Sequence, residues 1–325
     1  MNIFFYEAFL EEAQVLKELI PAHMTAGFTW KTIQERNNTT PPASLISIRT
    51  QSQIPTAWAS HLSGILTRST GYEHLAAYQE KCQIDIPCGY LPLYCNRAVA
   101  EQAAMLWLSL LRKLPQQMEQ FTKFHRDGLT GQECEHKTLL VVGVGNIGFE
   151  VVRIAKGLGM EVLGVDIIKK HTSVTYVSIE EGLAQADVIV CAMNLTNQNR
   201  GYFNYQTLKQ AKNGVIFVNI ARGELSPSLD LLQLLEESLL GGVALDVYNQ
   251  EKDLAVSLRT ACPNEDKEIQ ATLALGEHPN VILTPHNAFN TQEAVTRKAQ
   301  DTMKQLSHFF EKGRFLWPIP FSRLV

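Results

Sequence analysis

Three glycines in this chain have the spacing of a phosphate-binding turn. Gly143, Gly145 and Gly148 follow an apolar run at residues 139–142, and apolar residues then recur at helical spacing from 147 to 158. The pattern predicts a strand, a tight turn and a helix whose first backbone N–H groups point at a pyrophosphate. The first glycine permits the turn, the second lets the backbone approach a ligand, and the third lets the helix lie close to the strand. The turn therefore predicts a dinucleotide site.

A carboxylate ends the next apolar run. Asp166 directly follows residues 162–165, and a carboxylate at this distance from the glycines accepts hydrogen bonds from the ribose hydroxyls of NAD. The same negative charge would repel the additional phosphate of NADP. Two alternatives stay open: Asp166 serves only as a turn or cap residue, or Lys169 and Lys170 serve a 2′-phosphate. The sequence favours NAD.

An arginine, a glutamate and a histidine each come shortly after an apolar run. Arg222 follows residues 215–219, Glu251 follows 243–245, and His286 follows 281–283. The carboxyl ends of parallel strands share one edge of a sheet, where ligands bind. Oxidation of a hydroxy acid by hydride loss needs a base for the hydroxyl proton and a cation for the carboxylate, and these are roles of His and Arg. Glu251 beside His286 would fix the histidine tautomer and favour its protonated form. Singly, each residue also fits a surface or loop position without function.

Short apolar runs alternate with helical segments through the middle of the chain. The predicted strands are 139–142, 162–165, 188–191, 215–219, 243–245 and 281–283. This alternation predicts a doubly wound parallel α/β sheet. Because the glycine turn follows the first of these strands, the nucleotide domain begins near residue 100. The preceding residues carry strand signals at 3–6, 45–48 and 64–67 and form a second α/β domain.

Two predicted helices connect these domains. Residues 96–114 are expected to bridge them, and residues 292–313 are expected to return to the first domain. The chain would then cross between domains twice, which favours a hinge with a ligand-binding cleft. The polar segment 253–277, which contains Pro263, is predicted to be an extended loop with a short helix.

The bulk composition restricts the class of protein. A chain of 325 residues fits two domains, and 45% hydrophobic with 19% charged residues is typical of a globular protein. The net charge of −4 and the lack of a Lys/Arg-rich block argue against a nucleic-acid partner. No apolar run reaches membrane-spanning length and the first residues do not resemble a signal peptide, so we expect no membrane partner and a cytoplasmic location. The six cysteines lack metal-ligand spacing, and no metal site is predicted.

The motifs together resemble the D-isomer-specific 2-hydroxyacid dehydrogenases, which include D-lactate, hydroxypyruvate, glyoxylate and phosphoglycerate dehydrogenases. The resemblance covers nearly the whole chain and rests on several motifs in the order of the family. These are RSTGYEHL at 68–75, AVAEQA at 98–103, GVGNIG at 143–148, FVNIARGEL at 217–225, ALDVYNQE at 244–251 and TPHNAFNT at 284–291. The resemblance implies a Rossmann-type doubly wound parallel sheet, 98–289, inserted in a smaller flavodoxin-like α/β substrate domain, 1–97, completed by 290–325.

The same resemblance implies roles for individual residues. Arg222 would bind and polarise the 2-oxo acid, His286 would be the acid/base, and Glu251 would orient His286. Backbone groups of the turn 69–71 would hold the substrate carboxylate, that is Ser69, Thr70 and Gly71. Asp246 would influence the protonation of the histidine and is also among the implied contacts to NAD, which are Gly143, Gly145, Asn146, Ile147, Gly148, Asp166, Ala221 and Asp246. The family also implies a homodimer built around the helix at 98–111.

Departures from the family pattern bear on the substrate. Tyr94 aligns with the substrate-pocket tyrosine of the family, but the segment 87–94 is longer than usual. Phe289 matches a position that lines the side-chain pocket of D-lactate dehydrogenases and favours an apolar substituent. Arg49 lies in a loop that faces the substrate in the family, where a second cation would hold a second carboxylate or a phosphate; the alternative is a surface arginine. The sequence does not identify the acid.

Three functions are compatible with these features. The favoured one is an NAD-dependent oxidoreductase that interconverts a D-2-hydroxy acid and its 2-oxo acid. The second is a non-catalytic NADH-sensing protein, because the same fold serves as a transcriptional corepressor in some relatives. The third, a nucleotide-fold transferase such as a methyltransferase, leaves Arg222, Glu251 and His286 without a role.

Overall fold

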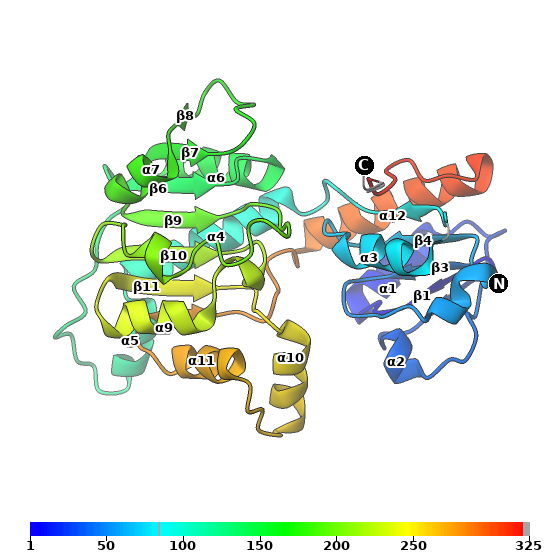
Figure 1. Cartoon of the computed structure of the whole chain (residues 1–325), viewed down its shortest axis with the longest axis horizontal. Coiled ribbons are helices and arrows are strands. Elements are labelled where there is room, and N and C mark those ends of the chain that lie inside the picture. Colours follow the sequence, from blue (N-terminus) through cyan, green and yellow to red (C-terminus); the bar gives the residue numbers. More distant parts are fainter. Residues whose placement is uncertain (84, 321–325) are drawn as a thin grey trace. The chain divides into compact units, whose positions relative to one another are not determined.

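The computed structural model describes residues 1–83 and 85–320 and divides the chain into two compact units. Unit 1 comprises residues 1–95 and the chain from residue 290, and unit 2 comprises residues 96–289. Each unit is built on one sheet of parallel strands with helices packed against it (Figure 1). The last residues of the predicted substrate domain, 321–325, lie outside the described part. Within the described part, no helix is long and apolar enough to cross a membrane.

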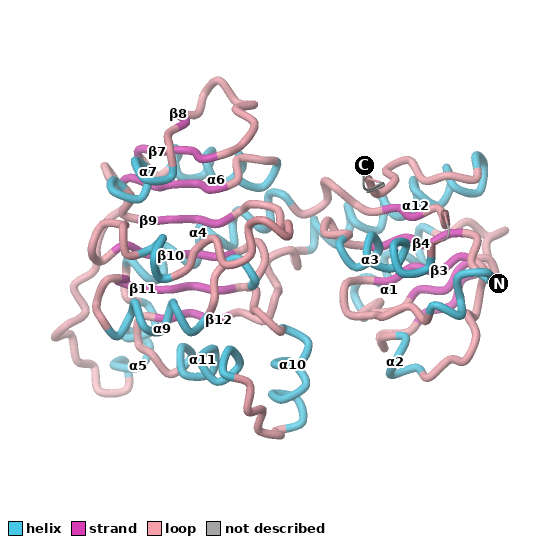
Figure 2. Tube along the Cα trace, viewed as in Figure 1, coloured by secondary structure: helices cyan, strands magenta, loops and turns pink. Residues whose placement is uncertain are grey.

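Unit 2 contains a seven-stranded parallel sheet in the order β12-β11-β10-β9-β6-β7-β8, whose strands lie side by side in Figure 2. The doubly wound sheet predicted from the sequence is confirmed, with all six predicted strands present. The two-residue β8 has no apolar run and was not predicted. The strands are β6 (Thr138–Val142), β7 (Glu161–Val165), β8 (Thr175–Tyr176), β9 (Val188–Cys191), β10 (Val215–Asn219), β11 (Leu240–Leu245) and β12 (Val281–Leu283).

Helices cover both faces of the unit 2 sheet. The helices are α4 (Asn96–Leu111), α5 (Leu114–Phe121), α6 (Asn146–Gly157), α7 (Ile179–Gln185), α8 (Tyr205–Leu208), α9 (Ser228–Glu236), α10 (Glu251–Thr260), α11 (Lys267–Gly276) and the 3₁₀ helix η2 (Gly223–Leu225). Helices α4 and α6 pack together on one face, and α7, α8, α9 and α11 cover the other. The central strands β9 and β10 are therefore buried throughout, which explains their continuous apolar runs.

Two helical predictions in unit 2 need correction. The segment 253–277 is not an extended loop, because α10 and α11 occupy most of it with ten residues each. Helix α10 buries only Leu254, and most of its residues are polar or charged. Helix α11 is capped by Asp266, whose carboxylate accepts the N–H of Glu268 at 2.9 Å. The helix predicted over 96–114 ends earlier, at Leu111, because Lys113 adopts a left-handed φ of 54°.

Unit 1 has a five-stranded parallel sheet in the order β2-β1-β3-β4-β5. Its strands are β1 (Ile3–Phe5), β2 (Ala26–Phe28), β3 (Leu45–Ile48), β4 (Gly64–Thr67) and β5 (Cys88–Gly89). Its helices are α1 (Leu10–Leu19), α2 (Ile33–Arg36), the 3₁₀ helix η1 (Thr56–His61), α3 (Glu73–Cys82) and α12 (Gln292–Lys312). The short strands β2 and β5 were not predicted. Helix α12, orange to red in Figure 1, packs against the blue α1, so the two ends of the chain share one core.

A buried ion cluster joins α1, α12 and the end of β4. The Nε of Arg68 donates to Glu12 Oε1 at 2.9 Å, and the Nζ of Lys298 lies 3.0 Å from the same oxygen. All three side chains are fully buried. Burial alone would raise the pKa of Glu12, but the charges of Arg68 and Lys298 outweigh it and lower the pKa to about 2. The carboxylate of Glu12 therefore stabilises the two buried cations of this core, Arg68 and Lys298.

We expect Glu12→Gln to lower the free energy of unfolding by about 3–5 kcal/mol, because the change leaves buried cations without their carboxylate. Glu11→Gln, on an exposed position of the same helix, is the control, and urea unfolding measures both. The pKa of Glu12 lies below the ordinary 4.5, so its stabilising contribution is present at neutral pH and is lost as pH falls from 4.5 towards 2. Equal stability of the two variants at pH 7 would contradict the prediction.

Candidate functional site

The glycine turn connects β6 to α6 in unit 2. Gly143 has a φ of 92°, which glycine adopts far more readily than other residues. A Cβ on Gly148 would lie 1.9 Å from the carbonyl oxygen of Gly143, so only glycine permits this approach of helix to strand. A Cβ on Gly145, in contrast, would meet no described atom within 4 Å. The first and third glycines thus serve the fold, and the second borders open space.

Backbone donors at the start of α6 face no partner in the described chain. The N–H groups of Gly145, Asn146 and Ile147 donate to no group among residues 1–83 and 85–320. They stand at the positive end of the helix dipole, where an anion is stabilised. Together with the open space beside Gly145, these donors fit the pyrophosphate of a dinucleotide.

Asp166 fastens the glycine turn to the end of β7. One carboxylate oxygen accepts the N–H of Val144 at 2.7 Å, and the other accepts the N–H of Ile168 at 2.8 Å. The side chain is partly exposed, so each oxygen has further capacity to accept a ribose hydroxyl. Asp166 therefore stabilises the turns around it, which is one of the two roles that the sequence allowed. The ribose contact remains a prediction.

His286 and Glu251 form a bidentate contact. The Nδ1 of His286 lies 2.8 and 2.9 Å from the two carboxylate oxygens of Glu251. Glu251 is the first residue of α10, and His286 follows β12 with a left-handed φ of 49°. The side chains are 31% and 28% exposed, respectively. Because the carboxylate holds the proton on Nδ1, Nε2 is the nitrogen that can exchange a proton with a ligand.

Asp246 braces the loop that carries His286. Its buried carboxylate, at the end of β11, accepts the N–H groups of Asn287 and Ala288 at 2.9 Å each and the hydroxyl of Thr284 at 2.6 Å. Burial raises the pKa of Asp246, against the opposing effect of these donors and of His286. Asp246 thus supports the backbone on either side of the histidine loop and interacts with the charge of His286, and its contact with NAD stays a prediction.

Two residues for which the sequence predicted no role, Asn219 and Gly223, position the loop of Arg222. Asn219, fully buried at the end of β10, donates its amide to the carbonyl oxygen of Arg222 at 2.9 Å and accepts the N–H of Ala221 at 3.0 Å. Gly223 packs on the next loop, where a Cβ would lie 1.8 Å from the carbonyl carbon of Tyr248. The sequence contains one indication of this role: Asn219 is the polar residue at the end of the otherwise apolar strand β10.

Unit 1 carries the predicted carboxylate-binding turn directly after β4. The side chains of this turn bond to nearby carbonyls: Ser69 Oγ donates to the carbonyl of Gly71 within the turn at 2.7 Å, and Thr70 Oγ1 donates to that of Leu91 at 3.2 Å. The backbone N–H groups of Ser69, Thr70 and Gly71 have no acceptor in the described part of the chain. Successive free N–H groups are suited to an anion, and the binding of the substrate carboxylate by this turn stays a prediction.

The remaining predicted substrate residues lie in both units. In unit 1, Tyr94 is buried, which raises its pKa well above the ordinary value. Arg49 is half-buried, with its guanidinium 5.4 Å from the ring centroid of Phe9, so it is not an exposed surface arginine. In unit 2, the Phe289 ring lies edge-on to the His286 ring with their centroids 6.4 Å apart.

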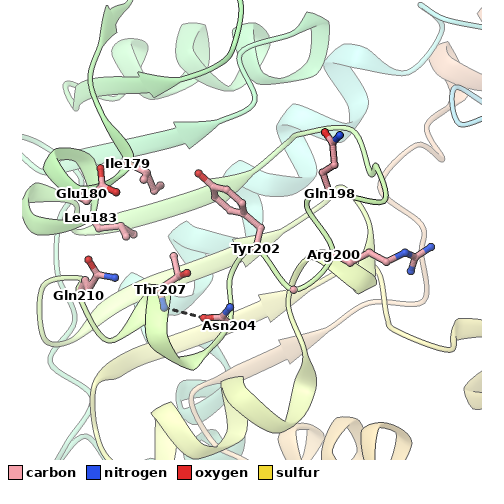
Figure 3. Close-up of a pocket in the computed structure, with 10 residues that line it drawn as sticks. Ile179, Glu180, Leu183, Gln198, Arg200, Tyr202, Asn204, Thr207 and Gln210 are labelled. Atoms are coloured by element: carbon pink, nitrogen blue, oxygen red, sulfur yellow. Dashed lines mark hydrogen bonds between the residues drawn. The ribbon is translucent and has the colours of Figure 1, made fainter. Parts of the chain in front are cut away.

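Other parts of the described structure do not add to this site. Figure 3 shows a hollow of about 320 Å³ in unit 2, between α7, α8 and the segment 198–204. Asn204 in this hollow accepts the N–H of Thr207 at 3.0 Å and caps α8. None of the predicted site residues lines it. Among the described residues, no three His, Cys, Asp or Glu side chains gather as a metal site.

Comparison with known proteins gives consistent matches. The family model described as D-isomer specific 2-hydroxyacid dehydrogenase, NAD binding domain, matches residues 104–288. An aromatic 2-oxoacid reductase of Clostridium sporogenes is 31% identical over 255 residues, which are 77% of this chain and 76% of the relative. A D-lactate dehydrogenase of Escherichia coli K12 is 34% identical over 229 residues, 69% of this chain and 68% of the relative.

Solved structures resemble the chain over almost its whole length. The D-lactate dehydrogenase from Aquifex aeolicus, complexed with NAD and lactic acid, has a TM-score of 0.82 at 26% identity and covers 97% of this chain and 99% of its own. A D-2-hydroxyisocaproate dehydrogenase has a TM-score of 0.84 at 23% identity and covers 98% of this chain and 99% of its own. At 23% identity, the similarity to the D-2-hydroxyisocaproate dehydrogenase shows only that the fold is shared.

The glycine turn leads to a prediction that separates binding from folding. Gly145→Val is expected to weaken NADH binding at least about tenfold, because the side chain would fill the space that a pyrophosphate approaches. Its thermal midpoint should stay near that of the unchanged protein. Gly148→Ala should lower the thermal midpoint through its clash with Gly143. Fluorescence titration with NADH and thermal unfolding measure the two effects.

Gly157→Ala is the matched control, since a Cβ at this exposed end of α6 also meets no described atom within 4 Å. It should alter neither NADH binding nor the thermal midpoint. Normal NADH affinity in Gly145→Val would show that the pyrophosphate binds elsewhere.

Proposed function

Because this chain belongs to the D-isomer-specific 2-hydroxyacid dehydrogenase family, we propose that it reduces a 2-oxo acid to the D-2-hydroxy acid by hydride transfer, with His286 as the acid/base. The chain is an NAD-dependent oxidoreductase of this family. The observation that carries the proposal is the bidentate contact of His286 Nδ1 with Glu251. It leaves Nε2 as the ring nitrogen for proton exchange.

The proposed residues divide the chemistry between them. Bound NADH supplies the hydride for the carbonyl carbon of the substrate. His286 Nε2 donates the proton that the carbonyl oxygen takes up, and accepts it again in the oxidative direction. Glu251 stabilises the imidazolium and fixes the ring. Arg222 binds the 2-oxo acid and polarises the carbonyl through its guanidinium fork.

Binding of the substrate carboxylate and of NAD is assigned to backbone groups. The free N–H groups of the turn 69–71 are proposed to hold the carboxylate. The donors at the start of α6 are proposed to hold the pyrophosphate, and Asp166 the ribose. Gly143 and Gly148 shape the glycine turn that presents these donors. We propose two further cofactor contacts, Ala221 beside Arg222 and Asp246 near His286.

We also propose that the protein forms a homodimer through α4 and α5. These helices expose large apolar side chains, among them Met105, Met118 and Phe121 with 48%, 69% and 73% exposure. Exposed large apolar side chains are frequent at protein contact surfaces. Light scattering would show a dimeric mass if the proposal holds, and a monomeric mass would contradict it.

His286→Gln is expected to lower turnover of a 2-oxo acid with NADH by about 100- to 10,000-fold, the usual value of proton transfer by a positioned side chain. NADH affinity should stay near normal, because the proposed cofactor donors lie in other loops. Loss of NADH absorbance measures turnover, and fluorescence titration measures affinity.

His125→Gln provides a matched control, since His125 also contacts a carboxylate in unit 2, at 3.3 Å from Asp127, but is 60% exposed. This variant should keep full turnover. Unchanged turnover in His286→Gln would remove the histidine from the mechanism. Tight NADH binding by the unchanged protein, without turnover of any 2-oxo acid, would favour an NADH-sensing role instead.

Arg222→Lys is expected to raise KM for the 2-oxo acid and to lower kcat, because an ammonium group cannot reproduce the bidentate fork. The positive charge is retained, so the loss reports on geometry. Steady-state kinetics with varied 2-oxo acid at saturating NADH measure both constants. Unaltered kcat/KM would exclude Arg222 from substrate binding.

A further inference from the structure

A chain of side-chain hydrogen bonds runs from α3 to the turn 69–71 in unit 1. The Nε2 of His74 lies 3.1 Å from Thr67 Oγ1, and Thr67 Oγ1 lies 2.7 Å from Ser69 Oγ. The Ser69 hydroxyl then donates to the carbonyl oxygen of Gly71 at 2.7 Å. His74 is the second residue of α3, and Thr67 is the last residue of β4. The side chain of His74 is therefore linked to the turn that precedes its helix.

The hydrogen bonds of this chain have one consistent direction. Ser69 Oγ donates its single proton to the Gly71 carbonyl, which can only accept. Ser69 Oγ must therefore accept the proton of Thr67, and Thr67 Oγ1 must accept a proton from His74 Nε2. The imidazolium and the neutral tautomer with its proton on Nε2 both supply this proton. The link to the turn thus requires an N–H at Nε2 and does not depend on the charge of His74.

The middle of this chain is closed to water. Thr67 is fully buried, and Ser69 is 8% exposed. A buried hydroxyl is stable only when it is hydrogen-bonded, and Thr67 Oγ1 bonds to Ser69 and His74. The rest of β4 is buried and carries no polar side chain, so valine, which has the shape of threonine, would serve the packing of the strand. The hydroxyl of Thr67 is therefore explained by its link to the turn.

The chain holds the turn in one conformation. The carbonyl of Gly71 is held by the Ser69 hydroxyl, and the carbonyl of Ser69 accepts the N–H of Leu91 at 3.1 Å. Because a peptide is planar and trans, the N–H of Thr70 then points away from the Ser69 carbonyl. The donors of the turn are thus oriented before a ligand binds, which lowers the cost of ordering them on binding.

We propose that His74 is a positioning residue for the substrate carboxylate and acts through Thr67 and Ser69 on the turn 69–71. The inference rests on the proposed function. His74 needs no contact with the substrate for this role. It should affect the binding of the 2-oxo acid and not that of NADH, whose proposed pyrophosphate donors lie in unit 2. Every 2-oxo acid carries the same carboxylate, so the effect should not depend on the side chain of the substrate.

The first test compares two substitutions of His74. His74→Leu removes the donor and retains apolar bulk, whereas His74→Gln retains an N–H donor near the position of Nε2. In His74→Leu, we expect KM for pyruvate, phenylpyruvate and 4-methyl-2-oxopentanoate to rise by one common factor of about two- to tenfold, the net value of a hydrogen bond. The kcat and the dissociation constant of NADH should stay near normal. His74→Gln should restore most of the affinity.

Oxamate provides a readout that does not need turnover. It carries the same carboxylate as pyruvate, but its amide carbonyl is not reduced. Its dissociation constant from the NADH complex, measured by the fluorescence of bound NADH, should rise in His74→Leu by the same factor as KM. The thermal midpoint of each variant shows whether the fold is intact.

His61→Leu is the matched control. His61 also lies in unit 1 with a ring nitrogen near a hydroxyl, since its Nδ1 is 3.3 Å from Ser60 Oγ. It belongs to η1 and is exposed, and no printed bond links it to the turn 69–71. The variant should alter neither KM nor the dissociation constant of oxamate.

The second test establishes the route through Thr67. Thr67→Val removes the hydroxyl between His74 and Ser69 and should also raise KM. The double variant Thr67→Val/His74→Leu should have the KM of Thr67→Val alone, because His74 acts through this hydroxyl. If the two effects multiply instead, the proposed route is overturned.

The outcomes separate this inference from the proposed function. Unchanged KM and oxamate affinity in His74→Leu would overturn the role of His74 and leave the dehydrogenase intact, even if the thermal midpoint falls. Unequal changes of KM among the three acids would also overturn it, because they would report on the side-chain pocket. If the unchanged protein binds NADH but reduces none of the acids, the proposed function fails, and the oxamate affinity of His74→Leu still decides the role of His74. Absence of both turnover and oxamate binding would overturn both proposals.

Discussion

The described strands β1 to β12 pair in parallel, apart from an isolated antiparallel bridge between Gly89 and Pro318, so the strands of each unit end at one common edge. Side chains that follow strands far apart in the sequence are brought together there. In unit 2 this constraint places the glycine turn, the Arg222 loop and the loops of Glu251 and His286 at the same edge. In unit 1 it places Arg49 beside the turn 69–71. The chemistry of the protein depends on this arrangement more than on any single contact.

The loops at these edges are held by buried polar side chains. Asp246 and Asn219 are almost or fully buried, and each bonds to the backbone of the loop that carries a proposed catalytic residue. A buried carboxylate or amide is stable only when it is hydrogen-bonded. The same bonds that satisfy these groups therefore set the positions of Arg222 and His286. Buried residues that support the loops thus contribute to the geometry of the site.

Unit 1 places charge in its core in a different way. Glu12, Arg68 and Lys298 come from the two ends of the chain and meet without exposure to water. Such a cluster is costly unless its charges are matched. The single carboxylate of Glu12 contacts both cations, Arg68 and Lys298.

The sequence by itself determined six of the seven strands of unit 2, the glycine turn and the family, because strands buried on both faces must be apolar throughout and tight turns require glycine. Only the tertiary structure decided what α10 is, since most of its residues are polar or charged and only Leu254 is buried. It also decided the bracing role of Asp246, the two bonds of Asp166 and the contact of Glu12 with Lys298. These depend on packing between segments distant in the sequence, and neither composition nor local spacing records such contacts.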